Sequence, residues 1–437
     1  MGWARGLYSA ALHLLSPLIW RRVRHEHALT DSRGGAGESP RTLRLGRIPE
    51  TPPGERMLWL HCASVGEVLA ARPLIEALLA RYPAHRLTLT TMTATGAERA
   101  RALAAARDDA RLISRFIPLD FPAAAARFVS RLRPELALLF ETELWPNLMA
   151  ACRRRGVPVA VVNGRLSPRA FRGYRRLRPL MREALACVDW LAAKSSADAE
   201  RFEWLGMARE RTAVVGSLKF DIATDDTVIG VSQRLRTRLG ERPVWVAGST
   251  HEGEETRLLA AHARLRESYS KPCPEALLVL VPRHPQRFDA VAALCARAGM
   301  RVARRSRGEW PTGECAVYLG DTMGDLLALY GAADLAFVGG SLVPIGGHNL
   351  LEPAALGVPV LTGPELANFA EVAETLLAAD ALVEVADEAA LAAALAELLG
   401  DPAERHRLGE AGRAVVAANR GALERTLEGL ARLLPPK

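Results

Sequence analysis

Several polar residues of this 437-residue sequence directly follow short apolar runs, and Glu67 is the first of them. It comes after Ser64-Val65-Gly66, where a stretch with helical spacing of apolar residues begins. A carboxylate in the first turn of a helix gains about 0.3–1 kcal/mol from the helix dipole, so an ordinary first-turn glutamate is one interpretation. The other is a general base that removes a proton from a hydroxyl nucleophile, with Gly66 allowing a substrate close to the backbone. The sequence leaves both open.

Two further groups of the first half have the same placement. Glu141 and Glu143 lie in ETELWPN, and alternation along an extended chain would aim both carboxylates the same way, toward an acceptor or a developing cation. A turn that caps the next helix explains the same residues. Lys219, in GSLKFD, is one of only four lysines in an arginine-rich chain. A compact ammonium group suits a sugar or phosphate approached closely, and a salt bridge with Asp221 is the alternative.

The second half carries residues suited to phosphate and ribose. Arg283, in PRHPQRF, can bind a phosphate with two parallel hydrogen bonds. The string GDTMGD at 320–325 leads into a helix, whose N-terminus attracts anions. The run GGSLVPIGGHNLLEP at 339–353 has four glycines that bring backbone N–H groups near a ligand. Glu352, one turn into the following helix, can accept hydrogen bonds from both hydroxyls of a ribose.

Alternating apolar runs and helical patterns must position these residues. Runs followed by helical stretches such as Val68–Arg81 predict parallel sheets covered by helices on both faces. The pattern breaks around Asp221–Arg242, which predicts two doubly wound domains, at 55–225 and 240–437, with a helical segment over Pro402–Leu434. Ligands bind at the carboxyl ends of such strands, so both active edges are expected to face one central cleft. The expected strands are Met57–Cys62, Arg86–Thr91, Glu135–Phe140, Val157–Val162, Trp190–Ala193, Thr212–Val215, Val244–Ala247, Ala276–Val281, Ala316–Leu319, Asp334–Val338 and Pro359–Leu361.

The N-terminal region carries an apolar stretch next to arginines. The apolar stretch Gly6–Trp20 precedes Arg21, Arg22 and Arg24, and is short for a membrane span of about 20 residues. It is either an anchor that dips into a membrane, with the arginines at the headgroups, or an amphipathic helix that covers the first domain. The segment Thr30–Gly54 is rich in Gly, Pro, Ser and Arg and indicates a linker or exposed loop.

Composition and missing motifs exclude several classes of protein. With 49% hydrophobic and 24% charged residues the chain is globular, and its net charge of +8 favours an anionic partner. No dense Lys/Arg block is present, so nucleic acid is not expected. The six cysteines have no zinc spacing and indicate reduced thiols. The sequence has no G-x-G-x-x-G, Walker A, G-x-S-x-G or H-E-x-x-H motif and no aspartates two positions apart. A two-domain sugar-nucleotide enzyme that needs no metal ion or other cofactor remains.

Six strings together resemble one known family, the 3-deoxy-D-manno-octulosonic acid (Kdo) transferases. The resemblance runs from about Trp59 to Phe369 and is carried by SVGE, ETELWPN, GRLSPRAFRGY, GSLKFD, PRHPQRF and GGHNLLEPAALGVPVLTGP. It implies an α/β fold of the GT-B type, with two Rossmann-like domains, and an inverting transfer of Kdo from CMP-Kdo to a lipid A precursor in lipopolysaccharide assembly. Cys62 stands where the family tends to carry a small residue.

The resemblance also implies roles for particular residues. Glu67 is the expected general base, and Glu141 and Lys219 the expected partners of the transition state. Residues 1–30 are expected to hold the enzyme, with basic residues, at the cytoplasmic face of the inner membrane. A non-catalytic membrane scaffold and another GT-B enzyme, such as a UDP-sugar epimerase or a peptidoglycan glycosyltransferase, are the alternatives. The expected CMP contacts are Pro282, Arg283, Met323, Gly324, Asp325, Asn349, Leu350, Leu351 and Glu352.

Overall fold

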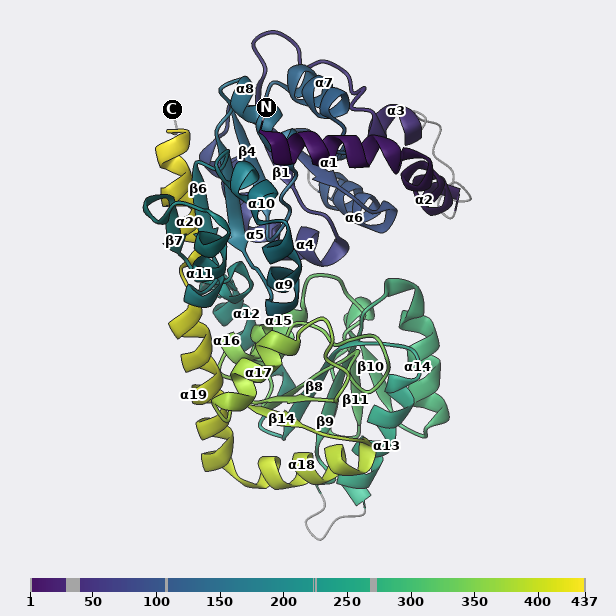
Figure 1. The fold of residues 1–437 in the computed structure, drawn as a ribbon. Helices are drawn as coiled ribbons and strands as arrows, with labels where there is room; N and C mark the ends of the chain where they lie inside the picture. The colour runs from purple at the N-terminus through teal and green to yellow at the C-terminus, as the bar shows by residue number, and fades with distance from the viewer. Residues whose placement is uncertain are drawn as a thin grey trace. The chain divides into compact units, whose positions relative to one another are not determined.

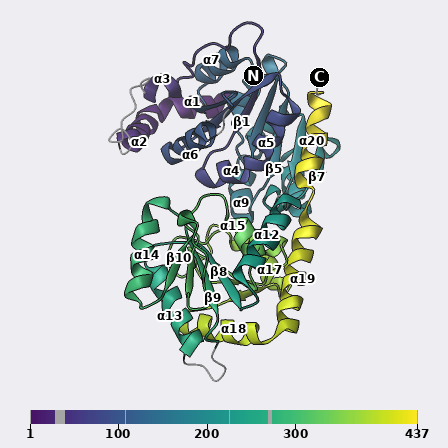
Figure 2. The same ribbon diagram turned by 180° about the vertical axis from the view of Figure 1, so that it is seen from behind.

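The computed structural model describes residues 2–28, 40–106, 109–222, 224, 226–267 and 273–435. The chain divides into two compact units (Figures 1 and 2). The first unit is Met1–Asp221 with Arg420–Lys437, and the second is Ile222–Asn419. The predicted second domain, 240–437, included residues 420–437. This boundary is wrong, because Leu427 and Leu430 pack in the core of the first unit.

The first unit is built on a parallel sheet of seven strands in the order β3-β2-β1-β4-β5-β6-β7. The chain starts in the middle, extends to one edge and then returns to extend toward the other, so the order reverses between β1 and β4. This is the doubly wound arrangement. The strands are β1 (Arg56–His61), β2 (His85–Thr91), β3 (Leu112–Phe116), β4 (Leu136–Phe140), β5 (Val159–Gly164), β6 (Trp190–Ala193) and β7 (Thr212–Val214).

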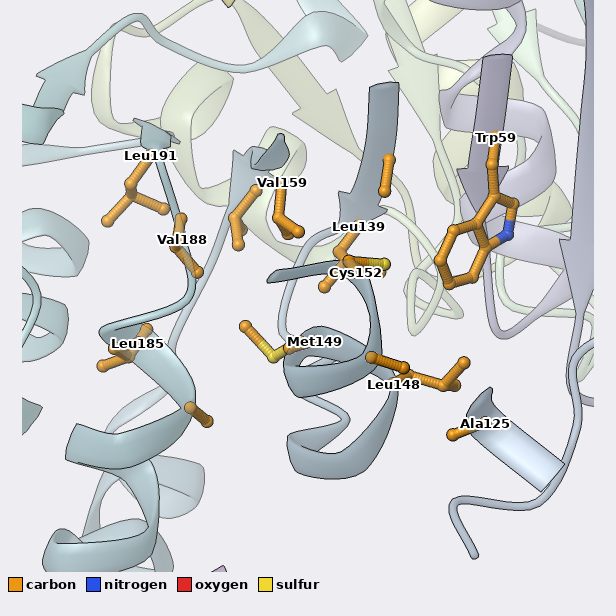
Figure 3. Packing of buried hydrophobic residues seen from close by; sticks show 14 of the residues in the cluster. Trp59, Ala125, Leu139, Leu148, Met149, Cys152, Val159, Leu185, Val188 and Leu191 are labelled. Atoms are coloured by element: carbon orange, nitrogen blue, oxygen red, sulfur yellow. The ribbon is translucent and has the colours of Figure 1, made fainter. Parts of the chain in front are cut away.

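Both faces of this sheet are buried, which explains why its central strands are apolar throughout. In β1, Met57 and Trp59 point into one cluster of buried residues, while Leu58 and Leu60 point into the other. Figure 3 shows the first cluster, where Trp59 lies in the layer with Leu148 and Met149 of α8. The helices of the unit are α1 (Trp3–Leu14), α2 (Ser16–Ala28), α3 (Pro40–Arg44), α4 (Val65–Ala70), α5 (Arg72–Arg81), α6 (Ala94–Ala105), α7 (Pro122–Leu132), α8 (Pro146–Arg154), α9 (Pro168–Arg176), α10 (Arg178–Leu185), α11 (Ser196–Leu205) and α20 (Ala422–Leu433), with short 3₁₀ turns η2 (Arg209–Arg211) and η3 (Leu218–Phe220).

The second unit repeats the architecture with seven parallel strands in the order β10-β11-β9-β8-β12-β13-β14. Its order reverses between β8 and β12. The prediction of two doubly wound parallel sheets is therefore confirmed. The strands are β8 (Val244–Thr250), β9 (Leu277–Pro282), β10 (Val302–Arg304), β11 (Val317–Leu319), β12 (Leu335–Val338), β13 (Val360–Thr362) and β14 (Leu382–Glu384). The helices are α12 (Asp226–Leu239), α13 (Glu254–Glu267), α14 (Phe288–Arg297), α15 (Leu326–Gly331), α16 (Leu351–Ala355), α17 (Ala370–Ala378), α18 (Glu388–Gly400) and α19 (Pro402–Asn419), with η4 (Pro285–Arg287) and η5 (Arg305–Arg307).

The strands that the sequence did not predict are β3, β10 and β14, and each lies at an edge of its sheet. Edge strands are covered less completely, so they carry polar residues such as Arg115 and Arg304 and lack a long apolar run. Two predicted helices are each interrupted. Val68–Arg81 is divided at Ala71, because Pro73 begins a new helix, and Pro402–Leu434 is divided at Gly421, which has φ +87°.

The segment predicted as a linker is partly structured. Residues 30–39 lie outside the described residues, whereas Pro40–Arg44 forms α3. Arg44 is buried, and its guanidinium donates to the backbone carbonyls of Ile117, at 3.1 Å, and Met92. Ile48 belongs to the core of the first unit. The exposed-loop prediction is therefore wrong for this part, because these carbonyls satisfy the buried cation.

The N-terminal helices pack on the first unit by one side. The carboxylate of Glu183 accepts hydrogen bonds from the backbone N–H groups of Ala4 and Arg5 at the start of α1. Ser9, on the buried side of α1, contacts the side chain of Asn147 at 3.2 Å. In the part of the chain that the structure describes, no helix has the length and apolar character needed to cross a membrane.

Candidate functional site

The edge of the first sheet where strand order reverses brings two of the predicted residues together. β1 and β4 pair directly, with His61 opposite Leu139 near their ends. Glu67 follows β1 on α4, and Glu141 follows β4 without an intervening residue. The carboxyl ends of neighbouring strands at such a reversal form the usual ligand site of an open parallel sheet.

Glu67 is oriented by a capping box formed with Ser64. The Ser64 hydroxyl oxygen accepts from the Glu67 backbone N–H at 3.3 Å, and the hydroxyl donates to Glu67 Oε1 at 3.0 Å. The Ala63 backbone N–H donates to Glu67 Oε2 at 2.8 Å. The first-turn interpretation of Glu67 is therefore confirmed, and the same contacts fix its carboxylate at the strand edge, while its role as a base stays a prediction.

The surroundings of Glu67 favour its neutral form. Burial, together with the negative charges of Glu143 and Glu141, raises the pKa of Glu67 to about 7, against the opposing hydrogen bonds from Ala63 and Ser64. A carboxylate is an efficient general base when its pKa lies near the working pH. The neighbouring Cys62 thiol is fully buried, and its pKa is raised by burial and then by Glu67, Glu141 and Glu143. Cys62 is therefore a neutral packing residue in this position.

Glu141 and Glu143 do not lie on an extended strand, so the prediction that alternation aligns them is wrong. Glu141 has a left-handed backbone with φ +57°, and the chain turns there. Glu143 accepts a hydrogen bond from the indole N–H of Trp145 at 2.9 Å and lies 3.5 Å from Nε2 of the buried His61. Of the two carboxylates, Glu143 has the larger effect on the pKa of Glu67.

Asn163 connects the loops that carry Glu141 and Lys219. Its side-chain oxygen accepts from the backbone N–H of Leu218 at 3.2 Å, and its amide lies 3.5 Å from Glu141 Oε1. Asn163 is buried and left-handed, with φ +52°. Lys219 lies in η3, directly after Leu218. Asp221, the predicted salt-bridge partner of Lys219, accepts from the backbone N–H groups of Gly421 and Leu423, each at 2.7 Å. It therefore caps α20.

The corresponding edge of the second sheet carries Pro282 and Arg283. Pro282 ends β9, and the Arg283 backbone N–H bonds to the carbonyl of Thr250 at the end of β8. Within the described ranges, Arg283 has no carboxylate partner. By contrast, Arg287 pairs with the buried Glu255 at 2.6 Å. Arg283 is therefore the cation of PRHPQRF that remains available to an anion.

The glycine-rich run after β12 does not offer all its N–H groups to a ligand. The buried carboxylate of Glu254 accepts from the backbone N–H groups of Gly340, at 2.8 Å, Ser341, at 3.1 Å, and Leu342, at 3.0 Å. It also accepts from His251 at 3.2 Å. The expectation that the first glycines hold a ligand through these N–H groups is wrong, because an internal anion already occupies them.

The remaining predicted CMP contacts fall into three groups. Met323 is exposed and Gly324 is left-handed, while Asp325 accepts from Arg305 at 2.8 Å, which helps hold the pKa of Asp325 below its usual value. Leu350 and Leu351 are fully buried, so a ligand could meet only their backbone.

Asn349 and Glu352 form the third group. Asn349 donates to Glu352 Oε1 at 3.2 Å and so orients this carboxylate at the start of α16. No group of three or more metal-ligating side chains occurs among the residues described.

Sequence reasoning did not single out Asn163 and Glu254, and it gave no separate role to Glu143. Glu254 lies 86 residues before Gly340, and Asn163 lies 55 residues before Leu218, so no local pattern could pair them. The available signal was their position at the carboxyl edges of the sheets, with Asn163 near the end of β5 and Glu254 after β8.

Two doubly wound domains with polar residues at their carboxyl edges define the class of the protein. The fold is similar to UDP-GlcNAc 2-epimerase from Neisseria meningitidis, with a TM-score of 0.53 and 12% identity over 86% of this chain and all of that chain. Residues 312–415 match the family described as "Glycosyl transferases group 1". The protein is a glycosyltransferase of the GT-B fold.

The particular family follows from closer relatives. Residues 41–222 match the family described as "3-Deoxy-D-manno-octulosonic-acid transferase (kdotransferase)". The chain is 40% identical to 3-deoxy-D-manno-octulosonic acid transferase of Bordetella pertussis over 98% of both chains. It is also 40% identical to the enzyme of that name from Haemophilus influenzae, over 86% of this chain and 87% of the relative. The chain belongs to the 3-deoxy-D-manno-octulosonic acid transferase family.

Proposed function

We propose that this enzyme transfers Kdo from CMP-Kdo to a sugar hydroxyl of a lipid A precursor, with inversion at the anomeric carbon and with Glu67 as the general base. The observation that carries the proposal is the fixed position and raised pKa of the Glu67 carboxylate. This carboxylate is fixed at the strand edge by Ser64 and Ala63, and burial raises its pKa to about 7.

The chemistry is a single displacement. Glu67 removes the proton of the acceptor hydroxyl as its oxygen forms a bond to the anomeric carbon. The bond from that carbon to the phosphate oxygen breaks, and its electron pair leaves with CMP. The sugar passes through a transition state with oxocarbenium character. The carboxylate of Glu141 stabilises the developing positive charge, and the ammonium of Lys219 binds the carboxylate of the Kdo unit.

The second unit binds the nucleotide. Arg283 lacks a carboxylate partner among the described residues, which supports a role in phosphate binding. Glu352 is oriented by Asn349 and accepts hydrogen bonds from the ribose hydroxyls. Charge on the leaving phosphate is therefore compensated by side chains, and we propose that no metal ion is required. Turnover that is abolished by EDTA and restored by a divalent cation would contradict this part.

Glu352→Ala is expected to weaken CMP binding by about 10–100-fold, because a hydrogen bond to a charged group contributes about 1.5–3 kcal/mol. Isothermal titration calorimetry with CMP measures this directly. Glu397→Ala, an exposed site on α18 in the same unit, is the matched control and should bind CMP as the wild type does. Equal affinity of Glu352→Ala and wild type would remove Glu352 from the ribose site.

The direct test of the activity is mass spectrometry of products formed from CMP-Kdo and a tetraacylated lipid A precursor. We expect the precursor to gain the mass of one or more Kdo units. A thermal shift with CMP but not UDP separates this activity from that of a UDP-sugar enzyme. Stabilisation by UDP alone, with no product, would contradict the proposed donor, and an absence of any turnover would favour a scaffold.

We also propose that α1 and α2 place the enzyme at the cytoplasmic face of the inner membrane, where they lie in the plane of the surface. The buried side of α1 is occupied by contacts with the first unit. Its other side exposes Trp3, Leu7 and Leu14, and α2 continues this stripe with Leu18. The arginines at 21, 22 and 24 follow directly. Apolar side chains next to arginines suit the boundary between acyl chains and anionic headgroups.

Replacing both Leu14 and Leu18 by Glu is expected to lower binding to vesicles that contain phosphatidylglycerol by at least about tenfold, since burial of each leucine contributes about 1.5–3 kcal/mol. Vesicle flotation provides the measurement. Leu377→Glu, at an exposed leucine of α17 in the second unit, is the control. Undiminished flotation of the double variant would contradict this role of the stripe.

A further inference from the structure

Three histidines gather at the carboxyl edge of the second sheet, and the proposed function assigns no role to any of them. His251 follows β8, His284 follows β9, and His348 lies in the glycine-rich loop after β12. These three strands are neighbours in the sheet, and β8 and β12 flank its reversal point. Arg283 lies at the end of the same edge, directly before His284.

His251 and His348 are in direct contact through one nitrogen of each ring. Their Nε2 atoms are 2.7 Å apart, and the ring planes are nearly parallel at 7° with centroids 5.0 Å apart. The His284 ring meets that of His251 edge-on, at 5.3 Å between centroids. Two imidazole nitrogens this close must share a proton, with one ring donating and the other accepting.

The surrounding backbone holds the pair in place. The His251 N–H donates to Glu254, the carboxylate that also fixes the N–H groups of Gly340 and Leu342. A Cβ atom on Gly340 would lie 2.9 Å from Cδ2 of His348, and the backbone of Gly340 is left-handed, with φ +69°. A glycine is therefore required for the His348 ring to occupy this place.

Hydrogen-bond counting defines what the pair can offer a ligand. Among the described residues, the Nδ1 atoms of His251 and His348 have no protein partner. In the neutral pair, the accepting ring carries a proton on Nδ1, and the donating ring carries a lone pair there. A single added proton on that lone pair gives two Nδ1–H donors and one positive charge, and the Nε2–H···Nε2 bond is kept.

The charges around the pair keep it neutral without a ligand. Burial, together with His251, Arg283 and His284, lowers the pKa of His348 to about 4. The pKa of His251 is lowered by burial and by His284, Arg287 and Arg283, against the raising effect of Glu255. Glu255 is largely compensated by its ion pair with Arg287. Glu254 is engaged by the backbone N–H groups.

We propose that the His251–His348 pair, together with Arg283, is the subsite for the phosphate of the nucleotide and takes up a proton when that phosphate binds. The proposal rests on the proposed donor being a cytidylate and adds the residues that hold its phosphate. A dianionic phosphate supplies the countercharge that the protonated pair lacks in the free protein. Binding of CMP therefore stabilises the imidazolium form, and affinity for CMP falls as the pH rises through the pKa of the pair in the complex.

The test is calorimetry of the full chain with CMP at about pH 8, roughly two units above the second phosphate pKa of about 6, so that the ligand itself exchanges few protons. Titrations in two buffers with different ionisation enthalpies give the number of protons taken up. Because the pKa of His348 in the free protein is about 4, we expect uptake of a measurable fraction of a proton per CMP, which increases as the pH is lowered toward about 7, and none with cytidine, which has no phosphate.

Two variants test the pair itself. His348→Gln and His251→Gln are each expected to abolish proton uptake and to weaken CMP binding by about 10–100-fold, the effect of losing a charged hydrogen bond. His406→Gln, at an exposed histidine of α19, should leave both quantities unchanged. Far-UV circular dichroism and thermal unfolding establish that each variant is folded.

The outcomes separate the two proposals. CMP binding by the wild type without proton uptake, or uptake that persists in both glutamine variants, would overturn the histidine subsite and leave the donor assignment intact. An absence of CMP binding to the wild type would overturn the donor assignment and the subsite with it.

Discussion

Glu67→Gln is expected to lower the turnover of Kdo transfer by about 10²–10⁴-fold, the usual contribution of a positioned general base. The amide keeps the size of the side chain and can still accept a hydrogen bond from Ser64 or Ala63, but it cannot take a proton from the acceptor hydroxyl. CMP affinity should be unchanged, because all the proposed nucleotide contacts are on the other unit. A radiometric or mass-spectrometric assay measures turnover, and calorimetry measures CMP binding.

The matched control is Glu98→Gln, an exposed site on α6 in the same unit. It should retain full turnover. Near-normal turnover of Glu67→Gln would mean that another group accepts the proton. A loss of both turnover and CMP binding would indicate that Glu67 is needed for the folded structure and not specifically for proton transfer.

The stability of Glu67→Gln relative to the wild type provides an independent test of the raised pKa of Glu67. The pKa of Glu67 is raised in the folded protein, from 4.5 to about 7, so folding favours its protonated form. The contribution of Glu67 to stability is fully present below about pH 4.5 and is lost as the pH rises through about 7. Glu67→Gln should therefore be more stable than wild type at pH 8 by about 1–3 kcal/mol, given about 1.4 kcal/mol per pKa unit and partial solvent access. Urea unfolding of both proteins at pH 8 and at about pH 4.5 measures the difference in stability.

Glu254→Ala is expected to destabilise the second unit by about 3–5 kcal/mol, because it removes the partner of several buried hydrogen-bond donors. Its carboxylate accepts hydrogen bonds from four backbone N–H groups, including those of Gly340, Ser341 and Leu342. Removal of the carboxylate leaves these buried donors unsatisfied, at about 1–3 kcal/mol each where water cannot enter. Chemical denaturation monitored by tryptophan fluorescence measures the loss.

Glu254→Gln makes this test sharper than alanine alone. Oε1 accepts from Ser341 and Leu342, and Oε2 accepts from Gly340 and His251. Whichever way the amide turns, its NH₂ group faces two N–H donors, so the isosteric variant should also be clearly destabilised. Glu397→Gln serves as the exposed control in the same unit. A Glu254→Gln protein as stable as wild type would show that these hydrogen bonds contribute little.

The central parts of the fold were predictable because parallel strands buried on both faces must be apolar along their whole length. Strands β1, β4, β8 and β9 are all of this kind. Edge strands such as β3 escape this rule, since one side of the strand has no neighbour. The position of α20 was also not predictable. Its packing against the first unit depends on apolar residues such as Leu427, and an apolar side chain in the sequence does not indicate which of two cores it enters.

The candidate site was predictable where its geometry is local. The spacing of Ser64 and Glu67 contains the capping box, so a first-turn carboxylate could be expected from the sequence. The left-handed backbone at Glu141 could not be expected, because nothing in ETELWPN marks it. The bonds of Glu254 and Asn163 depend on loops that only the sheet order brings together.

The central claim is that the Glu67 carboxylate is the base and that its neighbours set its pKa near 7. The most direct measurement is the pH dependence of turnover at saturating CMP-Kdo for the wild type and for Glu143→Gln. Turnover should rise with pH through about 7 in the wild type, because only the deprotonated carboxylate can accept the proton. In Glu143→Gln the rise should shift to lower pH, since a negative charge that raises the pKa of Glu67 is removed. A profile without this limb, or an inflection that Glu143→Gln leaves in place, would contradict the account.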